Sequence, residues 1–132
     1  MRGSGSDSLR LLYSYGWIEY FAEGKLAEKY AKYVDQANKA NTITPTIVIY
    51  EVYKKIKQER GEEAALKAYA QLLGTKIIQL NEEIALIVAD VSLKFGLGMA
   101  DAIIYATAKK ERAKLVTSDV HFKGLKDVEF IE

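Results

Sequence analysis

The sequence predicts an α/β fold, a three-layer α/β/α sandwich on a mainly parallel central sheet. Short apolar segments alternate along the chain with longer segments whose apolar residues recur at helical spacing. This alternation of strands and helices is typical of parallel sheets that carry helices on both faces. The chain has 132 residues, enough for one compact domain and too few for two ordinary ones.

The composition narrows the functional classes. Hydrophobic residues make up 49% of the chain and charged residues 28%, which supports a packed core and argues against disorder. The absence of cysteine excludes disulfides and zinc–thiolate sites, and the single histidine, His121, excludes a multi-histidine metal site. The net charge of +1 favours no class of partner, so any anion binding must come from local clusters.

Domain organisation and location follow from the same survey. Residues 1–8 are small and polar, and we expect them to be an added, disordered leader. Residues 9–132 are expected to form a single domain. No apolar run approaches the roughly 18 residues that span a bilayer, and no secretory signal pattern is present, so we expect a cytoplasmic protein.

The first half of the chain contains a clear helix-start signal. Thr44 and Pro45 resemble a capping hydroxyl followed by proline in the first turn, and Gly61 is a typical helix terminator. Val48, Val52 and Ile56 form an apolar stripe between them. The expected elements are a strand at 9–13, a helix from 17 that is interrupted at 24, a helix at 25–39, a strand at 42–44 and a helix at 45–60.

The second half begins with a helix that Gly74 ends. Asn81 is a capping residue, followed by two glutamates that complement the helix dipole. The expected elements are a helix at 62–73, a strand at 75–80, a helix at 82–95, a helix at 98–111, a strand at 114–117 and a strand at 128–131.

Three carboxylates are candidate site residues. Asp101 begins a small-residue helix, and Asp119 follows the strand at 114–117. If this strand and helix are neighbours, both acids reach the carboxyl end of the sheet, where ligand sites of open α/β folds collect. Carboxylates without a basic partner nearby in sequence indicate a Mg²⁺ or Mn²⁺ site. Glu51, two turns into its helix, either faces the same pocket or pairs with Lys54 or Lys55; simple capping roles for Asp101 and Asp119 also stay open.

Taken together, four segments resemble the signature regions of PIN domains, with the VapC-type toxins as the subgroup they are most similar to. Each motif is weak alone, but the ordered set, spread over residues 9–132, is fairly specific. The segments are 14–21 (SYGWIEYF), 44–52 (TPTIVIYEV), 101–108 (DAIIYATA) and 115–122 (LVTSDVHF).

The resemblance implies a metal-dependent endoribonuclease, often the toxin of a type II toxin–antitoxin pair. By position, the catalytic and metal-binding residues would be Glu51, Asp101 and Asp119 around Mg²⁺ or Mn²⁺, with Thr117 as a supporting polar neighbour. The implied partners are an RNA substrate, an antitoxin protein and a second copy of the chain in a homodimer.

Tyr13 departs from the family pattern. It stands at the end of the first strand, where the resemblance implies the first acid, and a neutral phenol with an ordinary pKa of about 10 is a poor ligand for a hard cation. Three explanations stay open: a deliberate change that disarms a toxin, a naturally degenerate member that binds RNA or an antitoxin without cutting, and a weakened site that works with three acids. A phospho-acceptor receiver domain fits less well, because the first strand lacks paired acids.

Other residues allow several interpretations. His121 is interpreted as a surface residue of the turn after Asp119 rather than a general base, and Ser14 and Ser118 lack an adjacent base for nucleophilic catalysis. Two basic clusters would be either solvated helix faces or a phosphate path; they are 54–60 and 109–114. A set of tyrosines is expected to form an aromatic contact surface for a partner; it comprises Tyr30, Tyr33, Tyr50, Tyr53 and Tyr69.

Overall fold

Five short strands form one sheet in the order β3-β2-β1-β4-β5, and all four strand pairs are parallel. The computed structural model describes residues 9–132, so the leader expected at 1–8 lies outside the described residues. The strands are β1 (Arg10–Leu12), β2 (Thr42–Pro45), β3 (Lys76–Ile78), β4 (Lys114–Thr117) and β5 (Val128–Phe130).

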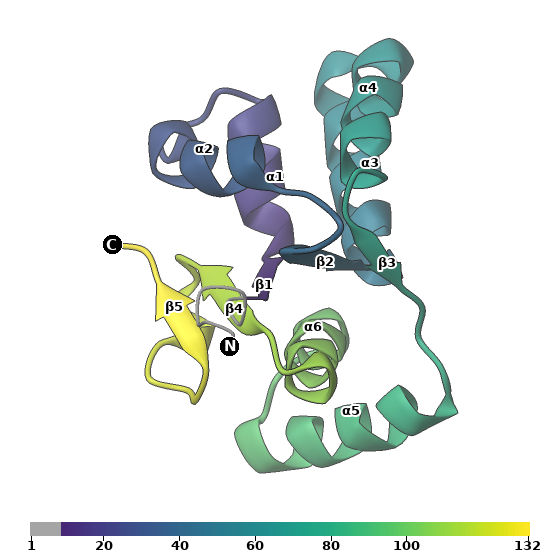
Figure 1. Ribbon diagram of the computed structural model, residues 1–132, viewed down its shortest axis with the longest axis vertical. Helices are drawn as coiled ribbons and strands as arrows, with labels where there is room; N and C mark the ends of the chain where they lie inside the picture. The colour runs from purple at the N-terminus through teal and green to yellow at the C-terminus, as the bar shows by residue number, and fades with distance from the viewer. Residues whose placement is uncertain (1–8) are drawn as a thin grey trace.

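Helices cover both faces of the sheet, which confirms the predicted α/β/α sandwich (Figure 1). The helices α1 to α4 lie on one side in Figure 1, and α5 and α6 lie on the other. Right-handed crossovers require this arrangement. The chain moves from β1 through β2 to β3 at one edge of the sheet, and then crosses back to β4 on the other side of β1. The reversal of direction places the later helices on the opposite face. The helices are α1 (Ser14–Phe21), α2 (Ala27–Gln36), α3 (Thr46–Arg60), α4 (Glu62–Leu72), α5 (Glu82–Phe95) and α6 (Met99–Glu111).

The central strand β1 lies between β2 and β4. Leu11 is paired with Ile43 on one side and Leu115 on the other, and all three side chains are fully buried. Leu12, the last residue of β1, is opposite Val116, which stands one residue before the end of β4. The two strands therefore deliver the residues that follow them to the same edge of the sheet.

Several local predictions are confirmed. The side chain of Asn81 accepts a hydrogen bond from the backbone of Ile84 at 2.9 Å and so caps α5. Gly96 follows α5 with φ +68°, the left-handed conformation that glycine adopts at low cost. The stripe of Val48, Val52 and Ile56 on α3 is buried.

The helix start at Thr44 was predicted wrongly. Thr44 is a fully buried residue of β2, and its hydroxyl lies 2.6 Å from the hydroxyl of Thr75 instead of capping α3. Pro45 is the last residue of β2, and α3 begins at the next residue, Thr46. The proline therefore lies at the strand–helix boundary, but as part of the strand and not of the first helical turn. Pairing with β3 decides this, because it extends the strand by one residue.

Other boundaries also differ. Helix α1 begins at Ser14 rather than at 17, because the carbonyl of Tyr13 accepts the first helical bond from Gly16 at 2.8 Å. Helix α2 is shorter than 25–39, and β3 is shorter than 75–80. Within residues 9–132, the helices are too short or too polar to cross a membrane.

Candidate metal centre at the carboxyl end of the sheet

The candidate site lies between β1 and β4, the point at which the chain connections leave in opposite directions. Crevices at such switch points, outside the carboxyl ends of the strands, are the usual ligand sites of open α/β sheets. Tyr13 follows β1 directly, and Asp119 stands two residues after β4. Asp101 reaches the same place from the first turn of α6, on the other side of the sheet.

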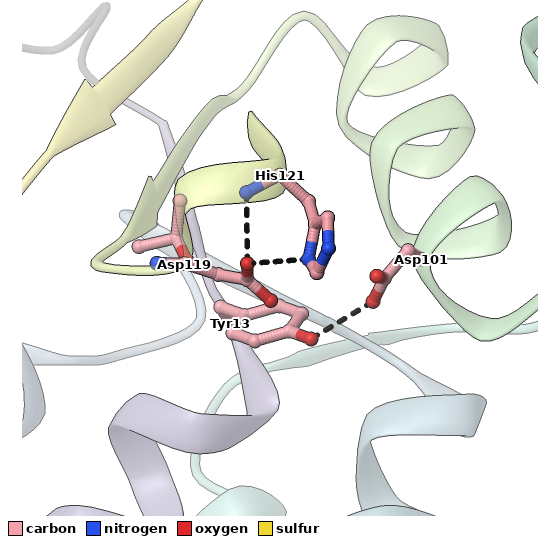
Figure 2. A network of polar contacts seen from close by, with 5 residues as sticks. Tyr13, Asp101, Asp119 and His121 are labelled. Carbon is pink, nitrogen blue, oxygen red and sulfur yellow. Dashed lines mark hydrogen bonds and ion pairs between the residues drawn. The ribbon is translucent and has the colours of Figure 1, made fainter. Parts of the chain in front are cut away.

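Tyr13 is held in the centre of this site. Its hydroxyl donates a hydrogen bond to Oδ1 of Asp101 at 2.8 Å (Figure 2). Its ring meets the ring of Phe122 edge to face at 5.3 Å. Burial raises the pKa of the Tyr13 phenol far above its ordinary value of 10.0, and the hydrogen bond to Asp101 and the charges of Asp101, Asp119 and Glu51 raise it further. Tyr13 therefore stays neutral and adds no charge to the site.

Asp101 is partly buried and does not cap its own helix. Burial raises the pKa of its carboxyl above 3.8; the hydrogen bond from Tyr13 lowers it, the charge of Asp119 raises it, and His121 lowers it. Because no side chain caps α6, whose N-cap residue is Gly98, the capping role considered for Asp101 is wrong. The residues that follow, 102–108, are all buried, as the apolar sequence of this helix predicts.

Asp119 is fixed by the backbone around it. Its N–H donates to Oγ1 of the buried Thr117 at 2.9 Å, and its Oδ1 accepts from the N–H of His121 at 2.9 Å. The second bond caps the short 3₁₀ helix η2 (Val120–Phe122), so the capping interpretation of Asp119 describes its local role. The same carboxylate also faces Asp101, and Thr117 acts on the site through the position of Asp119.

His121 completes a compact group that the sequence analysis missed. Asp101, Asp119 and His121 each offer one donor atom, and these atoms all lie within 4.8 Å of one another. Nδ1 of His121 lies 2.8 Å from Oδ1 of Asp119, and the three side chains face one space in Figure 2. The signal in the sequence was the Asp-x-His spacing, which one turn of 3₁₀ helix converts into a shared face.

Glu51 lies beside this group rather than within it. Its Oε1 accepts a hydrogen bond from the hydroxyl of Ser14 at 2.5 Å. Among the described residues, Glu51 forms no ion pair with Lys54 or Lys55; the neighbouring pair is Lys55–Glu59 at 3.0 Å. Glu51 and Ser14 instead line a cleft of about 310 Å³ together with Tyr13.

The donor set fits a divalent cation. Two carboxylates and an imidazole are established ligand types, and within residues 9–132 neither Asp101 nor Asp119 is paired with a lysine or arginine. The partly buried, neutral Tyr13 fits less well as a ligand, but its hydroxyl bonds Asp101 and orients it. The group can therefore hold an ion with Asp101, Asp119 and His121. Glu51 is outside this group, but its charge contributes to raising the pKa of Tyr13.

The two basic clusters differ in their distance from the candidate site. Lys54 and Lys55 line the cleft beside Glu51. Arg112 follows the end of α6, about 16 Å along the helix axis from Asp101 at 1.5 Å per residue. Lys114 is the first residue of β4, at the end away from Asp119. Only the first cluster therefore borders the candidate centre.

The expected tyrosine surface was partly wrong. Tyr30 is fully buried, with its hydroxyl 2.6 Å from that of Ser118, and Tyr33 donates to Glu129. The others, Tyr50, Tyr53 and Tyr69, line an apolar groove of about 750 Å³ between α3 and α4. Tertiary packing thus divides the set into core and surface.

A parallel sheet with an acidic group at its switch point defines the class: an α/β protein with a candidate metal centre. The family model of the PIN domain matches residues 16–128, and the chain belongs to the PIN domain family. No curated protein matches the chain.

Solved structures share the fold. A toxin–antitoxin complex from Klebsiella pneumoniae is 24% identical with a TM-score of 0.76, and the match covers 91% of this chain and 95% of that one. VapBC-1 from nontypeable Haemophilus influenzae is 22% identical with a TM-score of 0.66, covering 94% and 97%. VapC20 from Mycobacterium tuberculosis, a sarcin–ricin loop cleaving toxin, is 14% identical with a TM-score of 0.67, covering 79% and 84%. At these identities the likeness establishes the fold.

Proposed function

We propose that this chain is a metal-dependent endoribonuclease of the VapC type, the toxin of a type II toxin–antitoxin pair, with activity reduced by Tyr13. The observation that carries the proposal is the meeting of Asp101 and Asp119 at the carboxyl end of the sheet in a chain of the PIN family. The structural likeness to toxin–antitoxin complexes supports the choice of subgroup.

The proposed cofactor is Mg²⁺ or Mn²⁺, held by Asp101 and Asp119 with Glu51 nearby. Such an ion activates water and stabilises the charge that develops on a phosphate. The hydroxyl of Thr117 orients Asp119 by accepting a hydrogen bond from the Asp119 backbone N–H, and the hydroxyl of Tyr13 orients Asp101 by donating to its carboxylate. Ser14 holds Glu51 at the border of the cleft, where a carboxylate can orient water or substrate.

The cleft beside Glu51 supports RNA as the substrate. Lys54 and Lys55 line it and offer positive charge to a phosphate backbone, while Tyr15 and Tyr50 offer rings to unpaired bases. Basic grooves with aromatic platforms are the usual way in which proteins hold single strands. Because the second basic cluster lies away from the candidate site, the proposed path follows α1 and α3.

The proposed protein partners are an antitoxin and a second copy of the chain. The apolar groove between α3 and α4 suits an antitoxin peptide, since its lining is aromatic with Lys54 and Lys57 among the residues at its side. Leu86 and Leu93, one heptad apart on α5, are 72% and 86% exposed and would suit a homodimer. A cytoplasmic location is part of the same proposal.

A second candidate function is a catalytically silent module that binds RNA or an antitoxin. The observation in its favour is the hydrogen bond between Tyr13 and Asp101, which places a neutral phenol where another carboxylate would add charge. This candidate retains the cleft and the groove but not the metal chemistry.

One experiment separates the two. Mn²⁺ is titrated into the protein by calorimetry, and cleavage of mixed RNAs is followed in parallel, with Asp101→Asn as the matched variant. The proposal expects Mn²⁺ binding and Mn²⁺-dependent cleavage, both lost in Asp101→Asn. RNA binding without metal binding or cleavage in the parent protein would establish the silent module instead.

A further inference from the structure

The candidate metal centre of this chain includes a nitrogen donor. Two carboxylates and the imidazole of His121 bring their donor atoms within 4.8 Å, and Tyr13 contributes only a neutral hydroxyl. The site thus differs in kind from a purely carboxylate cluster. Imidazole suits ions such as Zn²⁺ and Co²⁺, whereas Mg²⁺ is a hard cation that prefers oxygen.

The spacing of the donors suits direct coordination. Neighbouring ligands of an ion with bonds of about 2.0–2.1 Å lie roughly 2.9–3.4 Å apart in octahedral or tetrahedral geometry. The 2.8 Å between Nδ1 of His121 and Oδ1 of Asp119 is close to this separation. A cation can therefore replace the shared proton with a small movement of the ring.

The position of His121 is prepared by the fold. Its backbone N–H is bonded to Asp119, and the next residue, Phe122, is fully buried against Tyr13. The imidazole itself is 72% exposed, so an ion can reach it from solvent. The fixed backbone lowers the entropic cost of ordering His121 when an ion binds, and the exposed side chain leaves the ion a path from solvent.

We infer that His121 is a metal ligand of this chain, together with Asp101 and Asp119, and that it shifts the preference of the centre from Mg²⁺ toward ions that accept nitrogen ligands. The expected order of affinity is Zn²⁺ and Co²⁺ above Mn²⁺, and Mn²⁺ above Mg²⁺. This inference rests on the proposed metal centre but not on RNA cleavage. It also assigns to His121 the donor role that Tyr13 cannot fill.

The single histidine allows a direct test. Protein labelled with ¹⁵N-histidine is titrated with Zn²⁺ and, separately, with Co²⁺, and the imidazole resonances are recorded by NMR. His121 is the one histidine in the sequence, so every imidazole signal belongs to it. Coordination should shift the resonance of the bound nitrogen with Zn²⁺ and move the ring protons outside the diamagnetic range with Co²⁺.

Variants measure the contribution to affinity by calorimetry. His121→Ala should weaken Zn²⁺ and Co²⁺ binding about tenfold or more, since even outer-shell partners of metal ligands contribute about 10- to 100-fold. Its Mg²⁺ affinity should change far less. His121→Asp should reverse the preference toward Mg²⁺, and Val120→Ala, at the exposed neighbouring residue of η2, should leave all affinities unchanged.

Two outcomes would overturn the inference, and they differ in whether the parent protein binds the ions. If Zn²⁺ and Co²⁺ bind and the binding is lost in Asp101→Asn, but the imidazole signals show no coordination, His121 is no ligand and the proposed carboxylate centre stands. If none of the four ions binds the parent protein, the metal centre and the proposed function fail together.

Discussion

Replacing Tyr13 with aspartate is the most informative perturbation of this site. The substitution places a carboxylate just beyond β1, beside Asp101, Asp119 and Glu51, the three acids whose charges already act on Tyr13. An additional oxygen ligand should tighten Mn²⁺ binding about tenfold or more, which is about 1.4 kcal/mol. Mg²⁺ should gain by a larger factor than Zn²⁺, because the new ligand is a hard oxygen.

The same change should destabilise the metal-free protein. It removes the hydrogen bond to Asp101 and the edge-to-face contact with Phe122, and it adds a like charge to the cluster. A hydrogen bond to a charged group and an aromatic pair together contribute about 2–4 kcal/mol to the free energy of unfolding. Metal at about 100 times its dissociation constant should raise the free energy of unfolding by about 2.7 kcal/mol. The stability of Tyr13→Asp should therefore depend strongly on metal.

The assays are urea unfolding with and without Mn²⁺, calorimetric Mn²⁺ binding, and cleavage of mixed RNAs. Tyr13→Phe is the matched control, because it removes the hydroxyl but keeps the ring and adds no charge. We expect Tyr13→Asp to bind Mn²⁺ more tightly and cut faster than both the parent protein and Tyr13→Phe. Equal Mn²⁺ affinity and equal cleavage in the parent and Tyr13→Asp would refute the reasoning that a missing carboxylate limits this site.

Two further predictions concern the scaffold. Gly16→Ala should lower the free energy of unfolding by about 1–3 kcal/mol in urea, because a Cβ at this buried helical position would stand 2.7 Å from the ring of Tyr30; an unchanged midpoint would show that the ring moves aside freely. Burial, with the hydrogen bond to Glu129, raises the pKa of Tyr33 from 10.0 to about 12, so its contribution to stability is complete below pH 10 and is lost as the pH rises through 12. Between pH 9 and 12, the free energy of unfolding measured with denaturant should therefore fall more steeply with pH for the parent protein than for Tyr33→Phe. Parallel curves of free energy against pH would contradict this assignment.

Local patterns identified most elements because they depend on neighbouring residues. The cap at Asn81, the end of α5 at Phe95 and the apolar stripe on α3 are determined within one or two helical turns, and all three are as predicted. The capping role predicted for Thr44 was wrong because the hydroxyl of Thr44 pairs with that of Thr75, 31 residues away and just before β3. A local sequence pattern does not reveal such a distant partner. The same holds for the early start of α1, which depends on how β1 ends.

The candidate site divides in the same way. The spacing of Asp101 and Asp119 relative to their helix and strand predicts that both reach one edge of the sheet, and the two side chains do meet there. His121 is exposed, as the sequence predicts, but its contact with Asp119 was missed because it depends on the turn of η2 and on the anchor of Phe122. The separation of the basic clusters likewise follows from the length of α6.

The sequence by itself determined the alternation of strands and helices, the cap at Asn81, and the residue types available for a metal centre, since these depend on side-chain chemistry and short-range spacing. Only the tertiary structure decided which of those residues face one another, because strand order joins segments that are far apart along the chain. It placed Tyr13 against Asp101 across 88 positions and Ser14 against Glu51 across 37. Those two contacts orient two of the three candidate carboxylates, Asp101 and Glu51.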